Sequence, residues 1–131
     1  MLRAGDCAWT VTTIAGKESG GAHTSVVLSR SKYAYETGQV IVAPLRRPKS
    51  SITGVLLQPS DLRRFTQAGL DQDRILDLSQ LYTVPLSQIG EPIGRVYEGK
   101  LRMILRELSS MAAATAGPLQ GRLARVEWAV Q

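Results

Sequence analysis

Residues 16–44, GKESGGAHTSVVLSRSKYAYETGQVIVAP, contain two short apolar runs separated by a polar connector. The runs 25–29 and 39–44 are rich in β-branched residues and are bounded by Gly, Pro or Ser. Such runs are typical of buried strands rather than of helices. The segment therefore predicts two neighbouring strands, with a helical turn between them that ends at Gly38 and with Pro44 closing the second strand.

His23 is the only histidine, and it stands between a glycine-rich loop (16–22) and the first of these strands. A loop that enters a rigid strand is a common place for a functional residue. An imidazole can exchange protons near neutral pH, which suits general acid–base catalysis. A lone histidine at a strand start is more often structural, so both interpretations stay open.

Working outward, runs at 7–13, 52–57, 75–78 and 81–84 predict further strands. Residues 60–65 predict a short helix capped by Ser60. An apolar stripe predicts a longer amphipathic helix over 98–114, which Gly117 and Pro118 would end; the stripe consists of Leu101, Ile104, Leu105, Leu108 and Met111. Short strands with one terminal helix indicate a mainly β fold, a small barrel closed by a helix.

The chain has 131 residues, of which 44% are hydrophobic and 21% charged, as expected for one globular domain. We expect a domain over 1–116 and a C-terminal appendage over 117–131. No apolar run approaches membrane-spanning length, the start lacks a signal-peptide pattern, and Cys7 is the only cysteine. A cytoplasmic protein without membrane contact is therefore expected, and one His with one Cys predicts no metal site.

The formal net charge is +5, and most of it lies in one region. Residues 46–64 hold five cations and one anion, or +4, which leaves +1 for the rest of the chain. A basic patch of this kind suits a polyanion or an acidic protein partner. A solvated surface loop is the other interpretation.

Two groups of motifs resemble the MazF/PemK toxin family over about residues 5–112. The N-terminal group is Gly5-Asp6 with Trp9, then Gly16-Lys17-Glu18 and Gly21, then VVLS at 26–29. The C-terminal group is Gln80 with Thr83-Val84, then IGEPIGRV at 89–96 and the final helix. Residues 84–91 are also similar to CcdB, a gyrase poison of the same fold.

The resemblance implies an SH3-like half-open barrel with short helices and a C-terminal amphipathic helix. It also implies a homodimer, a toxin role in a type II toxin–antitoxin pair, metal-independent cleavage of single-stranded RNA, and inhibition by an acidic antitoxin. The family's arginine before proline corresponds to His23, and its threonine after the strand-ending proline corresponds to Arg46. The aspartate and arginine that flank its glutamine motif correspond to Ser79 and Tyr82.

These considerations give two catalytic candidates, His23 and Arg46, with no metal and no cofactor. The RNA-binding candidates are Lys17, Glu18, Arg47, Lys49, Ser50, Gln80 and Tyr82. Arginine and lysine can hold phosphate, and Tyr82 can either stack on a base or pack in the core. The expected function is an endoribonuclease toxin; the alternatives are a non-nuclease toxin that binds gyrase or an antitoxin, as CcdB binds gyrase, and a nucleic-acid-binding regulator.

Overall fold

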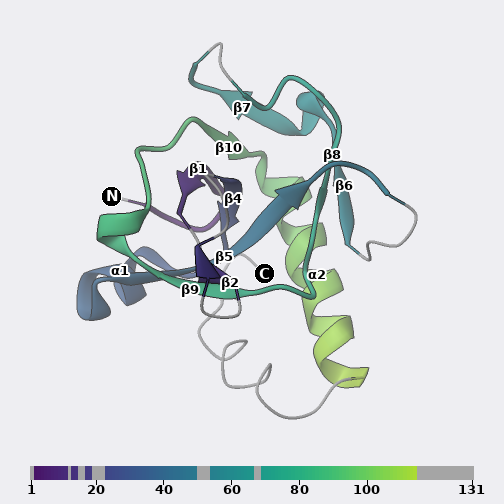
Figure 1. Ribbon diagram of the computed structural model, residues 1–131. Helices are drawn as coiled ribbons and strands as arrows, with labels where there is room; N and C mark the ends of the chain where they lie inside the picture. The colour runs from purple at the N-terminus through teal and green to yellow at the C-terminus, as the bar shows by residue number, and fades with distance from the viewer. Residues whose placement is uncertain are drawn as a thin grey trace.

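The computed structural model describes residues 2–11, 13–14, 17–18, 23–49, 54–66 and 69–114. Its main feature is an eight-stranded antiparallel sheet that curls into a nearly closed barrel (Figure 1). Seven strands lie in the order β6-β8-β5-β4-β1-β10-β7, and β9 pairs with β5 outside that path. The prediction of a mainly β, half-open barrel is confirmed.

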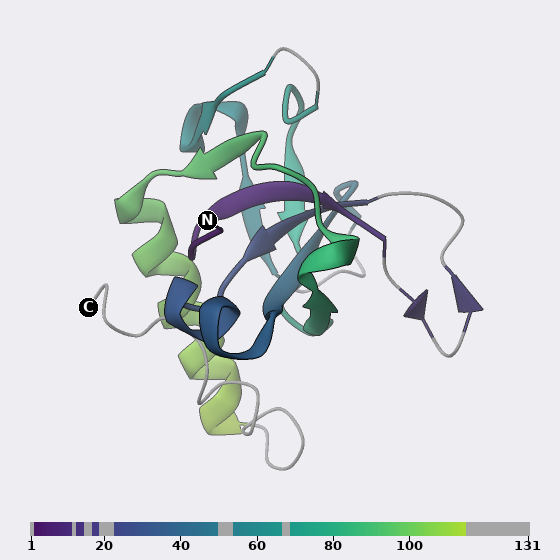
Figure 2. The ribbon, with the colours of Figure 1, turned by 90° about the vertical axis from the view of Figure 1, so that its left-hand side faces the viewer.

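The strands are short, as the sequence predicts. Those of the sheet are β1 (Asp6–Thr10), β4 (His23–Val27), β5 (Gln39–Arg46), β6 (Val55–Leu57), β7 (Leu62–Arg64), β8 (Arg74–Leu76), β9 (Tyr82–Pro85) and β10 (Gly94–Val96). A separate pair, β2 (Thr13–Ile14) and β3 (Lys17–Glu18), projects beyond the end of β1 (Figure 2).

Helix α1 (Ser31–Thr37) is the predicted turn between β4 and β5, and it ends at Gly38. Gly38 adopts φ +70°, and its N–H donates to the carbonyl of Ala34, as expected of a glycine that caps a helix. Helix α2 (Glu98–Ala114) lies against the barrel on one side (Figure 2). The predicted appendage, 117–131, lies outside the described residues.

The apolar stripe of α2 packs into the main core. Leu101, Ile104, Leu105 and Leu108 are buried, and Met111 packs beside them, which confirms the predicted helix. Each such side chain contributes about 1.5–3 kcal/mol through removal from water. Alternate residues of the central strands, such as Val26, enter the same core.

A second, smaller cluster covers the opposite face of the sheet. It consists of Leu2, Ala8, Val27, Ala34, Val40, Val42 and Val84, with Tyr82 and Ile89 packed against it. Because side chains alternate along a strand, residues an even number of positions from these on the same strand lie on the same face of the sheet. We call this the outer face.

Two predictions about local structure are wrong. Residues 60–65 do not form a helix: a 3-10 turn, η1 (Pro59–Asp61), leads directly into strand β7. The cap is Gln58 rather than Ser60, since the Gln58 N–H donates to Asp61 Oδ2 over 2.9 Å. Pro44 does not end its strand either, because β5 continues to Arg46 by changing its partner strand to β8. A second 3-10 turn, η2 (Leu86–Gln88), follows β9.

Candidate functional site

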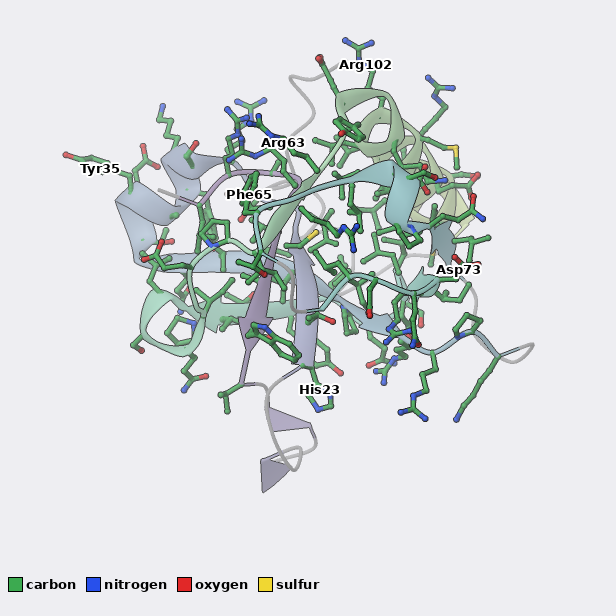
Figure 3. The ribbon with its side chains drawn as sticks, turned by 90° about the horizontal axis from the view of Figure 1, so that it is seen from above. His23, Tyr35, Arg63, Phe65, Asp73 and Arg102 are labelled. Atoms are coloured by element: carbon green, nitrogen blue, oxygen red, sulfur yellow. The ribbon has the colours of Figure 1, made fainter. Side chains whose placement is uncertain are left out.

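His23 is the first residue of β4, and the strand holds its backbone in place. It lies opposite Thr10 of β1, and the Thr10 hydroxyl donates to the His23 carbonyl over 3.1 Å. The same hydroxyl is 3.0 Å from the hydroxyl of the buried Ser25. The imidazole itself is exposed at the end of the strand (Figure 3). The main chain is thus anchored while the ring stays accessible to a ligand.

Arg46 is the last residue of β5, and a buried carboxylate holds its side chain. Its Nε donates to Asp77 Oδ2 over 2.8 Å, and 35% of the arginine side chain remains exposed against 8% of the aspartate. Asp77 Oδ1 accepts hydrogen bonds from the N–H and the hydroxyl of Ser79, over 3.1 and 2.5 Å. The Asp77 carboxylate therefore holds the Arg46 guanidinium in place, and Ser79 holds the carboxylate.

Sequence reasoning did not identify Asp77 as part of this site. A signal was present, because Asp77 interrupts the apolar run Ile75-Leu76-Asp77-Leu78. A charged group in a buried strand needs a partner, since unpaired burial of a carboxylate is costly. The partner is the arginine that ends the neighbouring strand.

Strand register brings His23 and Arg46 to the same end of the sheet. Pairing between β4 and β5 joins Ser25 to Pro44, and His23 and Arg46 each lie two residues beyond that pair on their own strands. The β4–β5 ladder ends at this pair. Alternation places both His23 and Arg46 on the outer face, since Val27 and Val42 on the same strands belong to the outer cluster.

Tyr82 and Gln80 approach this face from β9 and the loop before it. The Tyr82 hydroxyl donates to Gln80 Oε1 over 3.2 Å, and the ring packs partly against the outer cluster. Tyr82 pairs with Val42, four residues before Arg46, so it lies about 13 Å along β5 from that arginine. The packing interpretation of Tyr82 is therefore supported, and its half-buried ring still borders the outer face.

The remaining candidates lie in the adjoining loops. Arg47 and Lys49 are exposed and directly follow Arg46. Lys17 and Glu18 form β3, and their side chains lie outside what the structure describes, as does all of Ser50. Within the described ranges, no group of three His, Cys, Asp or Glu side chains is placed to hold a metal ion.

This arrangement, a half-open barrel with basic residues at the open ends of β4 and β5, can be compared with known proteins. Residues 3–112 match the family model of PemK-like, MazF-like toxins of type II toxin–antitoxin systems. The chain belongs to this toxin family. The match spans the whole described structure except its two ends, and it confirms the resemblance drawn from the sequence motifs.

Solved structures of MazF proteins share the fold of this family member. A MazE–MazF structure from Deinococcus radiodurans is 19% identical with a TM-score of 0.59, over 87% of this chain and 97% of that one. A mycobacterial endoribonuclease in complex with its cognate antitoxin is 15% identical with a TM-score of 0.59, over 90% and 100%. The Mycobacterium tuberculosis toxin MazF-mt6 is 18% identical with a TM-score of 0.54, over 84% and 99%.

At these identities the structural likeness establishes the fold. No protein of curated function matches the sequence. None of the helices in the described part of this MazF-family chain is long and apolar enough to cross a membrane.

Proposed function

We propose that this MazF-family toxin is an endoribonuclease that cleaves single-stranded RNA without a divalent metal. It acts in the cytoplasm as a homodimer and is inhibited by a cognate acidic antitoxin. The observation that carries the proposal is the position of His23 and Arg46, which end neighbouring strands at one edge of the outer face. The two side chains differ from the family's usual residues but supply the same kinds of chemistry, proton transfer and phosphate binding.

In the proposed reaction, the His23 imidazole takes the proton from a ribose 2′-hydroxyl. The 2′ oxygen attacks the adjacent phosphorus, the bond from phosphorus to the 5′ oxygen breaks, and water protonates the leaving oxygen. The hydroxide formed from that water takes the proton from the His23 imidazolium, which restores the neutral imidazole. The products are a 2′,3′-cyclic phosphate and a 5′-hydroxyl. Arg46, with Arg47 and Lys49 beside it, stabilises the additional negative charge on the phosphate oxygens.

The proposed partners follow from charge and from the related structures. An acidic antitoxin segment is complementary to a chain of net charge +5 whose exposed Arg47 and Lys49 adjoin the site. Two of the similar structures contain an antitoxin, one with MazF from Deinococcus radiodurans and one with a mycobacterial endoribonuclease. Gln80 and Tyr82 would contact a base of the bound RNA, and Lys17, Glu18 and Ser50 would border it from the loops.

The direct test is incubation of the full chain with a labelled single-stranded RNA and with the same RNA in duplex form, both in EDTA. The proposal predicts cleavage of the single strand only, with cyclic phosphate and 5′-hydroxyl ends. Intact single-stranded RNA across a panel of mixed sequences would contradict it.

A second function, a toxin that binds a protein target without cutting RNA, is favoured by one observation. Asp77 already balances much of the charge of Arg46, which weakens its hold on a phosphate. In that case the chain would leave RNA intact and would bind gyrase or an acidic antitoxin peptide, and the EDTA assay separates the two functions.

A further inference from the structure

Three charged residues form one cross-strand row at the other end of β1. Asp6 of β1 lies opposite Arg95 of β10, and Arg95 lies opposite Arg63 of β7. The Arg95 Nε donates to Asp6 Oδ1 over 2.7 Å, and Asp6 is fully buried. Like charges directly opposite each other on antiparallel strands repel, and the Asp6 carboxylate pairs with only one of the two arginines, Arg95.

Both guanidinium groups of the row lie over the same aromatic ring. The Cζ atom of Arg95 is 5.4 Å from the centre of the Phe65 ring, and that of Arg63 is 5.8 Å away. These distances fall within the range of cation–π contacts. Phe65 is still 42% exposed, and Tyr97, which follows β10, is 53% exposed. Two aromatic surfaces therefore stay accessible beside concentrated positive charge.

The positive charge of this face exceeds the negative charge around it. Among the described residues, the acids nearby are engaged: Asp6 pairs with Arg95, and Glu98 pairs with Arg102 over 2.7 Å. No described ion pair involves Arg3, Arg63 or Arg64. Three guanidinium groups thus have no counter-charge among the ion pairs of the described residues.

Two adjoining cavities connect these groups. One, of about 450 Å³, is lined by Arg3, Arg63, Arg95 and Tyr97 among others. The other, of about 410 Å³, is lined by Arg63, Arg64, Phe65 and Tyr97 among others. Each volume lies in the range of small-molecule sites and is sufficient for one nucleotide. Arg63 and Tyr97 border both cavities, so a chain of linked nucleotides can pass from one to the other.

We propose that this face, defined by Arg3, Arg63, Arg64, Phe65, Arg95 and Tyr97, is a second binding site for single-stranded RNA. Phosphates lie against the arginines, and a base stacks on Phe65 or Tyr97. The site is separate from His23. Asp6 lies about 13 Å along β1 from Thr10, the residue opposite His23, and β7 lies about 14 Å from β4 across three strand spacings. Figure 3 shows Arg63 and Phe65 far from His23. The inference rests on the proposed function only in that RNA is the ligand.

The composition of the face favours RNA over an acidic protein segment. An acidic peptide would need the cations alone, whereas this face pairs planar guanidinium groups with two accessible rings. Bases stack on both aromatic rings and arginine planes, whatever their sequence. The face thus holds RNA that extends beyond the cleavage position without selecting its sequence.

The test uses the full chain and a fluorescein-labelled RNA of about 12 nucleotides, within the range that single-strand-binding sites accommodate. Every ribose carries a 2′-O-methyl group, so the probe cannot be cleaved. Fluorescence anisotropy measures its affinity for wild type, Arg63→Gln, Phe65→Leu and Arg64→Gln. The matched control is Arg106→Gln, the same change at an exposed position of α2. Circular dichroism establishes that each variant is folded, and Arg64→Gln provides a second test in case Arg63→Gln fails to fold.

The proposal predicts that Arg63→Gln, Arg64→Gln and Phe65→Leu each weaken binding about 5–10-fold, since base stacking and phosphate contacts have effects of this size. The arginine variants also lower the slope of log affinity against log salt by about 0.7 per lost phosphate contact. Arg106→Gln changes the affinity less than about 2-fold. If the three face variants bind the RNA probe as tightly as wild type, the proposal is overturned. It is also overturned if these variants weaken the binding of an acidic peptide but leave RNA binding intact.

These outcomes are independent of catalysis. If the chain cleaves RNA but binds the probe equally well after Arg63→Gln and Phe65→Leu, the second site is disproved and the proposed function stands. If it binds through this face but leaves RNA whole in EDTA, the proposed function fails and the second site stands.

Discussion

Arg46 donates from Nε to Oδ2 of Asp77 over 2.8 Å, at the end of β5 where that strand pairs with β8. The Asp77 N–H in turn donates to the carbonyl of Pro44 over 2.9 Å. The ion pair therefore fastens the end of β5 to the segment that follows β8. The same contact decides how firmly the guanidinium is held for phosphate binding.

The ion pair predicts a measurable coupling between its two residues. Asp77→Asn should lower the free energy of unfolding by about 2–3 kcal/mol, because the carboxylate accepts three hydrogen bonds in a buried position. Urea denaturation of Arg46→Gln, Asp77→Asn and the double variant should give a coupling energy of about 1 kcal/mol. Asp73→Asn, an exposed neighbour, is the control and should stay within about 0.5 kcal/mol of wild type. Equal midpoints for Asp73→Asn and Asp77→Asn would show that the pair is not structural.

The row at the other end of β1 predicts opposite effects for its two arginines. Arg95→Met should cost about 3–5 kcal/mol, because it leaves the fully buried Asp6 carboxylate without its partner. Arg63→Met, the matched control on β7, should be neutral or slightly stabilising, since it removes a like charge opposite Arg95. Thermal and urea unfolding measure both. A larger loss from Arg63→Met than from Arg95→Met would contradict this account of the row.

Two glycines predict opposite results for the same substitution. A Cβ at Gly54 would collide with the Leu76 carbonyl oxygen, so Gly54→Ala should cost at least about 2 kcal/mol by pushing β6 away from β8. A Cβ at Gly99, in the first turn of α2, meets nothing within 4 Å. Gly99→Ala should therefore stabilise the protein by up to about 1 kcal/mol. Comparison of the two unfolding midpoints tests the close packing of β6 on β8. Equal midpoints for the two variants would disprove that packing.

Cys7 predicts a loss of stability at high pH. Burial, and to a lesser extent the neighbouring Asp6, raises the pKa of this thiol to about 12. The folded pKa lies above the unfolded value of about 9. The contribution of the neutral thiol to the free energy of unfolding is therefore fully present below pH ~9 and is lost as the pH rises from there towards 12. Cys7→Ala should unfold with a weaker dependence on pH over that window. Iodoacetamide at pH 8 should leave native Cys7 unmodified and label it in urea, and rapid labelling of the native protein would argue against this burial.

The sequence predicts most of the scaffold. The strands around 26–27, 40–43 and 82–84 are β-branched runs with sharp boundaries, and helix 98–114 shows a regular stripe that is buried as expected. The order of the family motifs predicted the barrel. These features are visible because each is set by local periodicity and by residues that punctuate the chain.

Other features depend on contacts between distant segments. Strand β7 has three residues, of which only Leu62 is buried, so it carries no periodic signal, and the prediction of a helix there was wrong. The passage of β5 through Pro44 requires β8 as a new partner, which no local pattern reveals. The Asp77–Arg46 pair and the Asp6–Arg95–Arg63 row likewise join residues separated by 31 or more positions.

The measurement that tests the central claim most directly is the single-turnover cleavage of a single-stranded RNA, in EDTA, by wild type and by His23→Ala. Lys32→Ala, an exposed substitution on α1, is the control. Loss of a general base should slow cleavage by about 10²–10⁴-fold while RNA affinity and the unfolding midpoint stay at their wild-type values. Equal cleavage rates for wild type and His23→Ala would contradict the placement of His23 in the reaction.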